Sequence, residues 1–455
     1  MTDSPKPLRS TSYLVVLTVM WGALSFHWTI VSNNVVPTRV LSFATEGTKG
    51  TVLGLVTVLG AVVSILIGPI AGVLSDESRS RWGRRRPFLA VGVVLNCIAL
   101  LALIGAQSLV SFIVAFLAVQ LFANLAGSPY TALIPDQVPD IQKGRATGFA
   151  GFAEVVGRLA GAILGGFLIS LPGAAAVLGV GLFFLPHAVR TQPMLPITLL
   201  IIAVTLASMV FTLLRVREEV PPTAPERTGA HFLRRAFTFD VRAEASFAWL
   251  LAARGCNMLA INTIVTFLLY YVRDYLGFTN IAEANARLGY LFAVSSLTTL
   301  PSSLIVGYLI DRHQRRKRWV YASSAGLALV CVAFIVVDRF STALLTGAFF
   351  GLCYGAYFTA DWALALALLP KGDAAAKYMG IWGIAGTFPQ VLAPGIGGVL
   401  LDTFNRVGHN WGYPVIFVTV VLYLMVGTVM LIKVDEPGPL PASVPDAVTN
   451  RRPAS

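Results

Sequence analysis

Residues 72–87 read GVLSDESRSRWGRRRP, and residues 307–318 read GYLIDRHQRRKR. Each stretch ends an apolar segment that begins with a Leu-Gly pair. The aspartate in each, Asp76 or Asp311, lies 22 residues after the glycine of that pair and precedes a basic cluster. Because the same plan occurs twice in one apolar chain, the sequence predicts a membrane transporter built from two homologous helical bundles.

The composition is typical of a polytopic membrane protein. Of the 455 residues, 56% are hydrophobic and only 12% are charged, and the mean hydropathy is +0.74. A soluble chain could not cover so much apolar surface, whereas helical runs of about 20 apolar residues cross the hydrocarbon core of a bilayer. The apolar piece 173–186 is too short to span comfortably, and we interpret it as part of an external loop, with a re-entrant segment as an alternative. The twelve predicted spans are 13–36, 50–74, 87–106, 109–134, 146–171, 194–214, 246–272, 286–310, 319–337, 341–369, 377–401 and 412–433.

The basic residues are distributed unevenly across the predicted membrane. The formal net charge is +12, and 25 of the 34 Lys and Arg residues fall on the side of the N-terminus, seven on the other side and two within spans. This is the positive-inside bias. It predicts a multi-pass protein with both termini in the cytoplasm. The expected membrane is a plasma membrane or a bacterial inner membrane. The bias also excludes nucleic acid as the reason for the charge.

Two polar intervals divide the chain. Residues 215–245 contain PPTAP and several arginines and separate six predicted spans from six, so we interpret them as a cytoplasmic linker. The linker joins an N-terminal six-helix bundle (1–214) to a C-terminal six-helix bundle (246–433). A Pro-rich, disordered cytoplasmic tail follows at 434–455. The predicted fold class is therefore an all-α membrane protein with twelve transmembrane helices.

The loop after the second predicted span carries a family signature. Gly72 and Asp76, followed by Gly83 and a run of arginines, resemble the loop between spans 2 and 3 of the major facilitator superfamily, with ESRSRW as an insertion. The longer form RWGRRRPF is similar to the sucrose–proton symporters and their bacterial relatives, a branch near the glycoside–pentoside–hexuronide cation symporters. SPYTALIPD and the following KGRATG resemble the same branch. The resemblance implies two pseudo-symmetric six-helix bundles that give alternating access to a midplane site.

In that superfamily the loop cluster latches the cytoplasmic side in one conformation. Asp76 stands at a helix end beside five arginines, where arginine pairing or the N-terminus of another helix could hold its charge. The alternative is that these arginines only set the topology. The residues expected in the latch are Gly72, Asp76, Gly83, Arg84, Arg85, Arg86, Asp311 and Arg312.

Ionisable residues inside the predicted spans are costly and need a partner or a wet cavity. Glu154 and Arg158 lie four residues apart, which puts them on one helix face as an ion pair. Protonation of Glu154 would free Arg158 to engage a solute or another acid. The alternative is a structural tie between helices that never titrates.

Asp361 is the isolated acid of the second half. Tyr354 and Tyr357 precede it by seven and four residues and lie on the same helix face. Aromatic faces beside a carboxylate suit a polyhydroxylated ring, and a desolvated carboxylate can carry a proton. The alternative is a mid-helix acid that a serine or threonine of a neighbouring helix satisfies.

Further polar residues are candidates for substrate binding or proton coupling. The resemblance to the sucrose symporters implies that Asp136 and Arg145 take part in proton-coupled transport, although the two could instead be a helix-end pair. Short polar stripes within spans could line a midplane cavity or join helices through hydrogen bonds. Their candidate members are His27, Asn34, Gln120, Asn124, Arg254 and Asn257.

The sequence favours a secondary transporter over other classes. We expect a proton-coupled sugar or glycoside symporter, with a proton-coupled drug or metabolite exporter of the same fold as the alternative. Span 50–74 contains no acid, which argues against the paired-aspartate sodium site of the melibiose-type relatives. No phosphate-binding loop, nucleophile–base set or metal-ligand cluster is evident, so we expect no enzyme activity, cofactor or metal. The expected partners are a small solute, protons and the lipid bilayer, and the expected functional unit is a monomer.

Overall fold

The computed structural model describes residues 8–170, 186–216, 218, 244–313, 315–368 and 375–436. All regular structure in these ranges is helical, without a strand. In the first half the long helices are α1 (Thr11–Ile30, continued by η1, Val31–Val35, and α2, Val36–Val40), α3 (Lys49–Glu77), α4 (Arg86–Gly105), α5 (Leu109–Thr131), α7 (Asp140–Ser170) and α10 (Leu195–Arg215). In the second half they are α12 (Ala245–Tyr270, continued by η2, Tyr271–Tyr275), α13 (Ile281–His313), α14 (Arg316–Val336), α15 (Phe340–Leu368), α16 (Ala375–Val407) and α17 (Gly412–Met430). The short helices are α6 (Leu133–Gln137), α9 (His187–Arg190) and η3 (Leu431–Lys433).

Each predicted span overlaps one of the long helices, so the predicted all-α membrane fold is confirmed. Among the described residues, eleven helices of 20 to 31 residues are long and apolar enough to cross a membrane. For α16, many side chains of its first half lie outside the described residues. The interpretations of 173–186 as a loop, of 215–245 as a linker and of 434–455 as a tail fall almost wholly outside them as well.

Local sequence explains where several helices begin. Ser10 Oγ accepts a hydrogen bond from Tyr13 N and caps α1, and Ser108 forms a reciprocal capping box with Ser111 at the start of α5. A proline stands in the first turn of α4 and of α10, where its missing N–H costs no helical hydrogen bond. These helix starts are therefore encoded locally, before any packing between helices.

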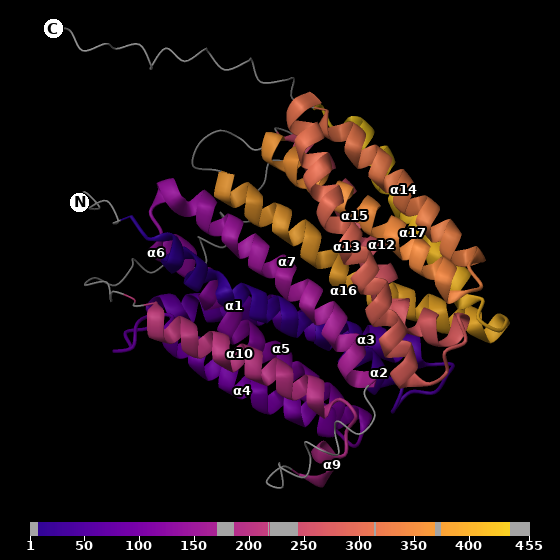
Figure 1. Cartoon of the computed structure of the whole chain (residues 1–455), viewed down its shortest axis with the longest axis horizontal. Helices are drawn as coiled ribbons and strands as arrows, with labels where there is room; N and C mark the ends of the chain where they lie inside the picture. Colours follow the sequence, from indigo (N-terminus) through magenta and orange to yellow (C-terminus); the bar gives the residue numbers. More distant parts are fainter. Residues whose placement is uncertain are drawn as a thin grey trace.

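The helices form two bundles (Figure 1). Helices α1, α3, α4, α5, α7 and α10 pack against one another, and α12 to α17 form the second group. Small residues allow α1 and α7 to approach closely, because a Cβ at Gly157 would overlap the carbonyl oxygen of Gly22. Gly161 and Gly165 continue this row along α1.

The main contacts between the bundles join α3 with α16 and α7 with α13, and η1 of the first bundle also touches α12 of the second. Helix α3 ends, and α4 begins, where the arginines 84–86 lie; we call this the arginine-rich end of the molecule. The close contacts lie at the opposite end. Gly50 near the start of α3 lies against Gly398 near the end of α16. Gly289 near the start of α13 lies against Gly166 near the end of α7.

Each bundle has a π-helical turn in its first helix. In the first bundle η1 follows α1, and in the second η2 follows α12. A π-turn inserts an extra residue into the helix and redirects the side chains around it, and such turns are frequent at functional sites. Both turns carry polar residues, Asn33 and Asn34 in η1 and Arg273 and Asp274 in η2.

A second repeat joins helices at the arginine-rich end of each bundle. Residues 215–218 read RVRE, and residues 433–436 read KVDE. Glu218 Oε2 accepts a hydrogen bond from Arg85 N at 2.8 Å, and Glu436 Oε1 accepts one from Arg316 N at 2.6 Å. Each glutamate thus follows the last helix of its bundle and caps the third helix of the same bundle.

Candidate transport site

A cavity of about 300 Å³ lies between the two bundles. Its walls come from α1, η1, α2, α3 and α5 of the first bundle and from α12 and α16 of the second. None of the described residues that line it is ionisable, and its polar surface consists of amide and hydroxyl groups beside one indole ring. The residues that carry these groups are Trp28, Ser32, Asn33, Thr57, Ser64, Gln120, Asn124, Asn262, Thr266 and Gln390.

Hydrogen bonds within the walls orient several of these groups. Ser64 Oγ donates to Asn124 Oδ1 at 3.0 Å, and Asn124 Nδ2 donates to the Gln120 carbonyl oxygen at 2.8 Å. Asn262 Nδ2 donates to the Met258 carbonyl oxygen at 2.7 Å. Because amides and hydroxyls both donate and accept, such walls can hydrogen-bond a solute rich in hydroxyl groups, while an indole face covers its C–H surface.

The π-turn η1 sends neighbouring asparagines to different places. Asn33 lines the cavity, whereas Asn34 is fully buried and donates through Nδ2 to Asn285 Oδ1 of the second bundle at 3.0 Å. Asn34 is therefore a contact between the bundles and not part of the cavity lining. His27, the other candidate in this helix, is buried inside the first bundle with its Nδ1 3.3 Å from Asn96 Nδ2.

Asp361 of α15 and Arg254 of α12 form an ion pair inside the second bundle. Their side chains are only 2% and 7% exposed. The guanidinium carbon of Arg254 lies 3.4 Å from the centre of the Trp382 ring, and Tyr357 lies beside Asp361 and Asn257. The acid thus has a partner on a neighbouring helix, and this partner is an arginine rather than the serine or threonine of the alternative.

Glu154 and Arg158 of α7 form the predicted ion pair. Arg158 also interacts with Tyr354 of α15, so the pair faces the second bundle. The Arg158 side chain is 49% exposed and that of Glu154 33% exposed. Three predicted residues therefore meet between the bundles, although they do not belong to the lining of the cavity.

Asp136 is paired, but not with Arg145. Its Oδ2 accepts hydrogen bonds from Arg85 Nε at 2.7 Å and from Arg84 Nη2 at 2.8 Å. Arg145 instead donates to Thr11 Oγ1 at 3.0 Å. The helix-end pair of Asp136 with Arg145 is therefore not formed, because two arginines before α4 satisfy the carboxylate and Arg145 lies against the start of α1.

The arginine cluster is held within the first bundle. Arg85 Nη1 donates to Ser75 Oγ at 2.8 Å, and Arg86 donates to the carbonyl oxygen of Leu213. Gly83 has a φ of +107°, a conformation that favours glycine, and a Cβ there would also clash with Glu218.

The latch itself stays a prediction. Gly72 lies within α3 facing Ser128, and Arg312 is exposed. The side chains of Asp76 and Asp311, on which the latch depends, lie outside the described residues.

Only part of the cavity lining was predicted from the sequence. Asn124 and Gln120 were among the candidates, whereas Asn33, Asn262 and Gln390 were not. Single amides in apolar helices show no spacing pattern, which is why they were overlooked. A signal was nevertheless present, because a side-chain amide in a span needs a hydrogen-bond partner and is a candidate for a polar cavity on that ground alone.

Two helical bundles around an uncharged polar cavity, with a buried ion pair in the second bundle, define a multi-pass membrane transporter of the major facilitator fold. The chain belongs to the MFS/sugar transport protein family, whose sequence profile matches residues 28–433. This membership confirms the resemblance seen in the loop after α3. The family and the relatives below are transporters, so the prediction that the chain is not an enzyme is also confirmed.

Curated relatives match over limited segments. The general alpha-glucoside permease of Schizosaccharomyces pombe is 30% identical over 176 residues, which cover 35% of this chain and 31% of that protein. The lactose permease of Lactobacillus helveticus is 24% identical over 151 residues, 30% of this chain and 23% of that protein. The sucrose transport protein SUT1 of Oryza sativa subsp. japonica is 26% identical over 94 residues, 21% and 17% of the two chains. The matches thus span less than a third of the length of each of these relatives.

Solved structures match along nearly the whole chain. The crystal structure of a D-xylose–proton symporter has a TM-score of 0.68 at 17% identity and covers 94% of this chain and 99% of that one. A bacterial homolog of the human lysosomal transporter Spinster, in an inward-facing and unoccupied conformation, has a TM-score of 0.67 at 16% identity, with coverage of 94% and 95%. At these identities the likeness shows the fold alone.

Proposed function

We propose that this chain is a proton-coupled symporter that moves a neutral sugar or glycoside through the cavity by alternating access. The observation that carries the proposal is the cavity lining, in which both bundles contribute amide or hydroxyl groups and no described residue is ionisable. A charged solute would lose hydration there without gaining a counter-charge, whereas sugar hydroxyls find donors and acceptors. Curated relatives named for alpha-glucosides, lactose and sucrose support the same class of solute.

In this proposal the arginine-rich end faces the cytoplasm, in agreement with the positive-inside bias. The opposite end is then external, and the contact of Gly50 with Gly398 helps to close it. The bundles, 1–214 and 246–433, move as two bodies joined by the linker 215–245. The membrane is a plasma membrane or a bacterial inner membrane.

The ion pair of Asp361 with Arg254 is the proposed proton-coupling element. Arg254 and the cavity residue Asn262 lie eight residues apart on α12, and Trp382 and the cavity residue Gln390 are likewise eight apart on α16. Protonation of Asp361 would release Arg254, which also contacts Trp382. A change in this pair therefore acts on the two helices through which the second bundle lines the cavity.

The test is uptake into proteoliposomes that contain the full chain. We expect a neutral sugar to accumulate when the outside is made acidic, and a protonophore to reduce uptake to simple equilibration. A sugar uronate and an amino sugar should not accumulate. Faster loss of solute under the imposed gradient would identify an exporter instead, and equal accumulation of the uronate would reject the neutral-solute cavity.

A matched pair of variants ties uptake to this cavity. Gln390→Ala should raise the KM for the sugar about fivefold, the loss expected for one hydrogen bond to the solute. Gln107 is exposed in the loop between α4 and α5, so Gln107→Ala should leave KM unchanged. Equal KM values in the two variants would place the solute elsewhere.

A further inference from the structure

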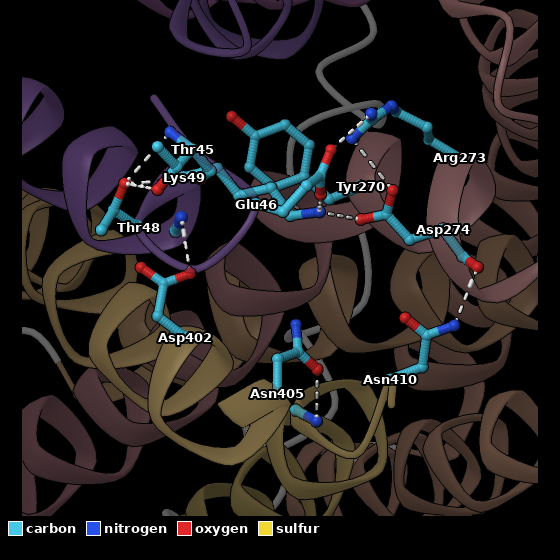
Figure 2. Close-up of polar contacts among 12 residues, drawn as sticks. Thr45, Glu46, Thr48, Lys49, Tyr270, Arg273, Asp274, Asp402, Asn405 and Asn410 are labelled. Carbon is cyan, nitrogen blue, oxygen red and sulfur yellow. Dashed lines mark hydrogen bonds and ion pairs between the residues drawn. The ribbon is translucent and has the colours of Figure 1, made fainter. Parts of the chain in front are cut away.

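An aspartate of the second bundle caps a helix of the first bundle (Figure 2). Asp402, near the end of α16, accepts hydrogen bonds from Gly50 N at 3.0 Å and from Thr51 N at 2.6 Å. Only 2% of Asp402 is exposed. Thr48, at the N-cap position of α3, makes no side-chain hydrogen bond to the helix, so Asp402 supplies the acceptor for the first-turn amides.

Lys49, the first residue of α3, makes a second contact with the other bundle. Its Nζ pairs with Asp274 of η2 and with Glu46, which precedes α3 (Figure 2). The side chain of Lys49 is 4% exposed and that of Asp274 is 13% exposed, and the Tyr413 hydroxyl also donates to Asp274. Parting of the bundles separates Lys49 from Asp274 and leaves it with Glu46, so water must replace the lost carboxylate partner.

Further polar contacts join the bundles around these two. Arg273 Nη2 donates to Glu46 Oε1 at 2.7 Å, and Arg406 Nη2 donates to the Gly47 carbonyl oxygen at 3.1 Å. The hydrogen bond from Arg273, together with that from Lys49, lowers the pKa of the Glu46 carboxyl to about 2. Glu46 therefore remains charged throughout the physiological pH range.

These contacts lie between the cavity and the end of the molecule opposite to the arginine-rich end. Helix α3 contributes Leu53 to the cavity, one turn after Lys49. Helix α16 contributes Pro394, two turns before Asp402. Neither Lys49 nor Asp402 is among the described residues that line the cavity.

We propose that Asp402 and Lys49 form an inter-bundle lock that holds this end closed, Asp402 on the N-terminus of α3 and Lys49 on Asp274. The lock rests on the proposed alternating access, in which it forms when the bundles meet at the external end and breaks when they part. Both contacts act at short range, a carboxylate on helix N–H groups and a carboxylate on an ammonium group. Water must replace both sets of partners before solute can enter from outside.

The lock can be tested without any solute or pH gradient, so failure of the proposed sugar transport would not affect the result. Spin labels at Gln107→Cys and Ser341→Cys report the separation of the bundles, since both residues are exposed at the external ends, one in each bundle. The labels are placed in a chain whose four native cysteines are replaced by alanine. The measured quantity is the ratio of the population with a long label-to-label distance to the population with a short one. Asp402→Ala should raise this ratio about fivefold, the shift expected for loss of a helix cap.

Three further variants keep the test decisive. Lys49→Met should shift the ratio in the same direction even if Asp402→Ala fails to fold. Asp402→Asn keeps an acceptor oxygen and should give a smaller shift. Glu283→Gln is the control, because Glu283 is an acid near the same end that pairs with Arg287 on its own helix. The lock is overturned if Lys49→Met and each folded Asp402 variant leave the ratio equal to that of the control.

Discussion

At the scale of single residues, the decisive contact is the buried pair of Arg254 with Asp361. The sequence identified Asp361 as an intramembrane acid that needs a partner, because an isolated charge in this environment is costly. It could not identify that partner, which lies 107 residues away on another helix. The stacking of Arg254 on Trp382 adds a second favourable contact for the buried cation.

Asp361→Asn should distinguish the contribution of this pair to the stability of the protein from its role in proton coupling. The variant leaves Arg254 buried without its carboxylate, and we expect a loss of about 3–5 kcal/mol in the free energy of unfolding. Adding Arg254→Met removes the orphaned charge and should restore most of that stability. Proton-driven accumulation should be lost in both variants. Thermal unfolding in detergent and sugar accumulation measure the two quantities, and accumulation that persists in the double variant would exclude the pair from coupling.

The two asparagines of η1 should differ in their effects, although they are neighbours in the chain. Asn33 lines the cavity, so Asn33→Ala should raise the KM for the sugar about fivefold, as expected for one lost hydrogen bond. Asn34 contacts Asn285 of the other bundle, so Asn34→Ala should change the inter-bundle distance and should change the KM for the sugar less than Asn33→Ala does. Measured KM values and spin-label distances distinguish these outcomes. A larger KM change in Asn34→Ala would contradict the assignment.

At the scale of helices, the sequence predicts existence and order well. Apolar runs, first-turn prolines and serine caps are local signals, and each of the twelve predicted spans overlaps one of the long helices. The π-turns η1 and η2 were not predicted from the sequence. The repeat of RVRE at 215–218 and KVDE at 433–436 is a further sequence signal. It marks the glutamates that cap α4 and α14.

The crossing of α3 and α16 depends on glycine at the contact. A Cβ at Gly398 would overlap the carbonyl oxygen of Gly50, so Gly398→Ala should force the two helices apart and open the external end. Overpacking of this kind costs about 1–3 kcal/mol, enough to shift the population toward the open state at least fivefold. The measurement is the rate at which an impermeant maleimide, added outside intact cells, modifies a cysteine introduced at Thr57 in the cavity.

Gly68 provides the matched control on α3. A Cβ there would meet no atom within 4 Å, so Gly68→Ala should leave the labelling rate unchanged. If Gly398→Ala is labelled no faster than this control, the glycine contact does not hold the end closed.

At the scale of the whole molecule, the sequence predicted two bundles but not which of their ends are in contact. Conformations of a transporter differ by a few kcal/mol, and no local pattern in the chain records that difference. The contact of Gly50 with Gly398 and the cap from Asp402 show the bundles joined at the end opposite to the arginine-rich end. Both contacts join helices of different bundles, so closure at this end depends on the position of one bundle relative to the other.

If the bundles pivot as bodies, the two ends of the molecule must respond in opposite directions. Gly148 of α7 and Tyr308 of α13 are exposed near the arginine-rich ends of two helices that touch at their other ends. In Lys49→Met, spin labels at these positions should approach one another. The population with the short distance should rise here by the same factor as the population with the long distance rises for the external pair at 107 and 341. A saturating neutral sugar should shift both ratios together. If the external pair separates while the pair at 148 and 308 stays constant, the helices bend locally near the lock, and access to the cavity is then gated by single elements rather than by rotation of one bundle against the other.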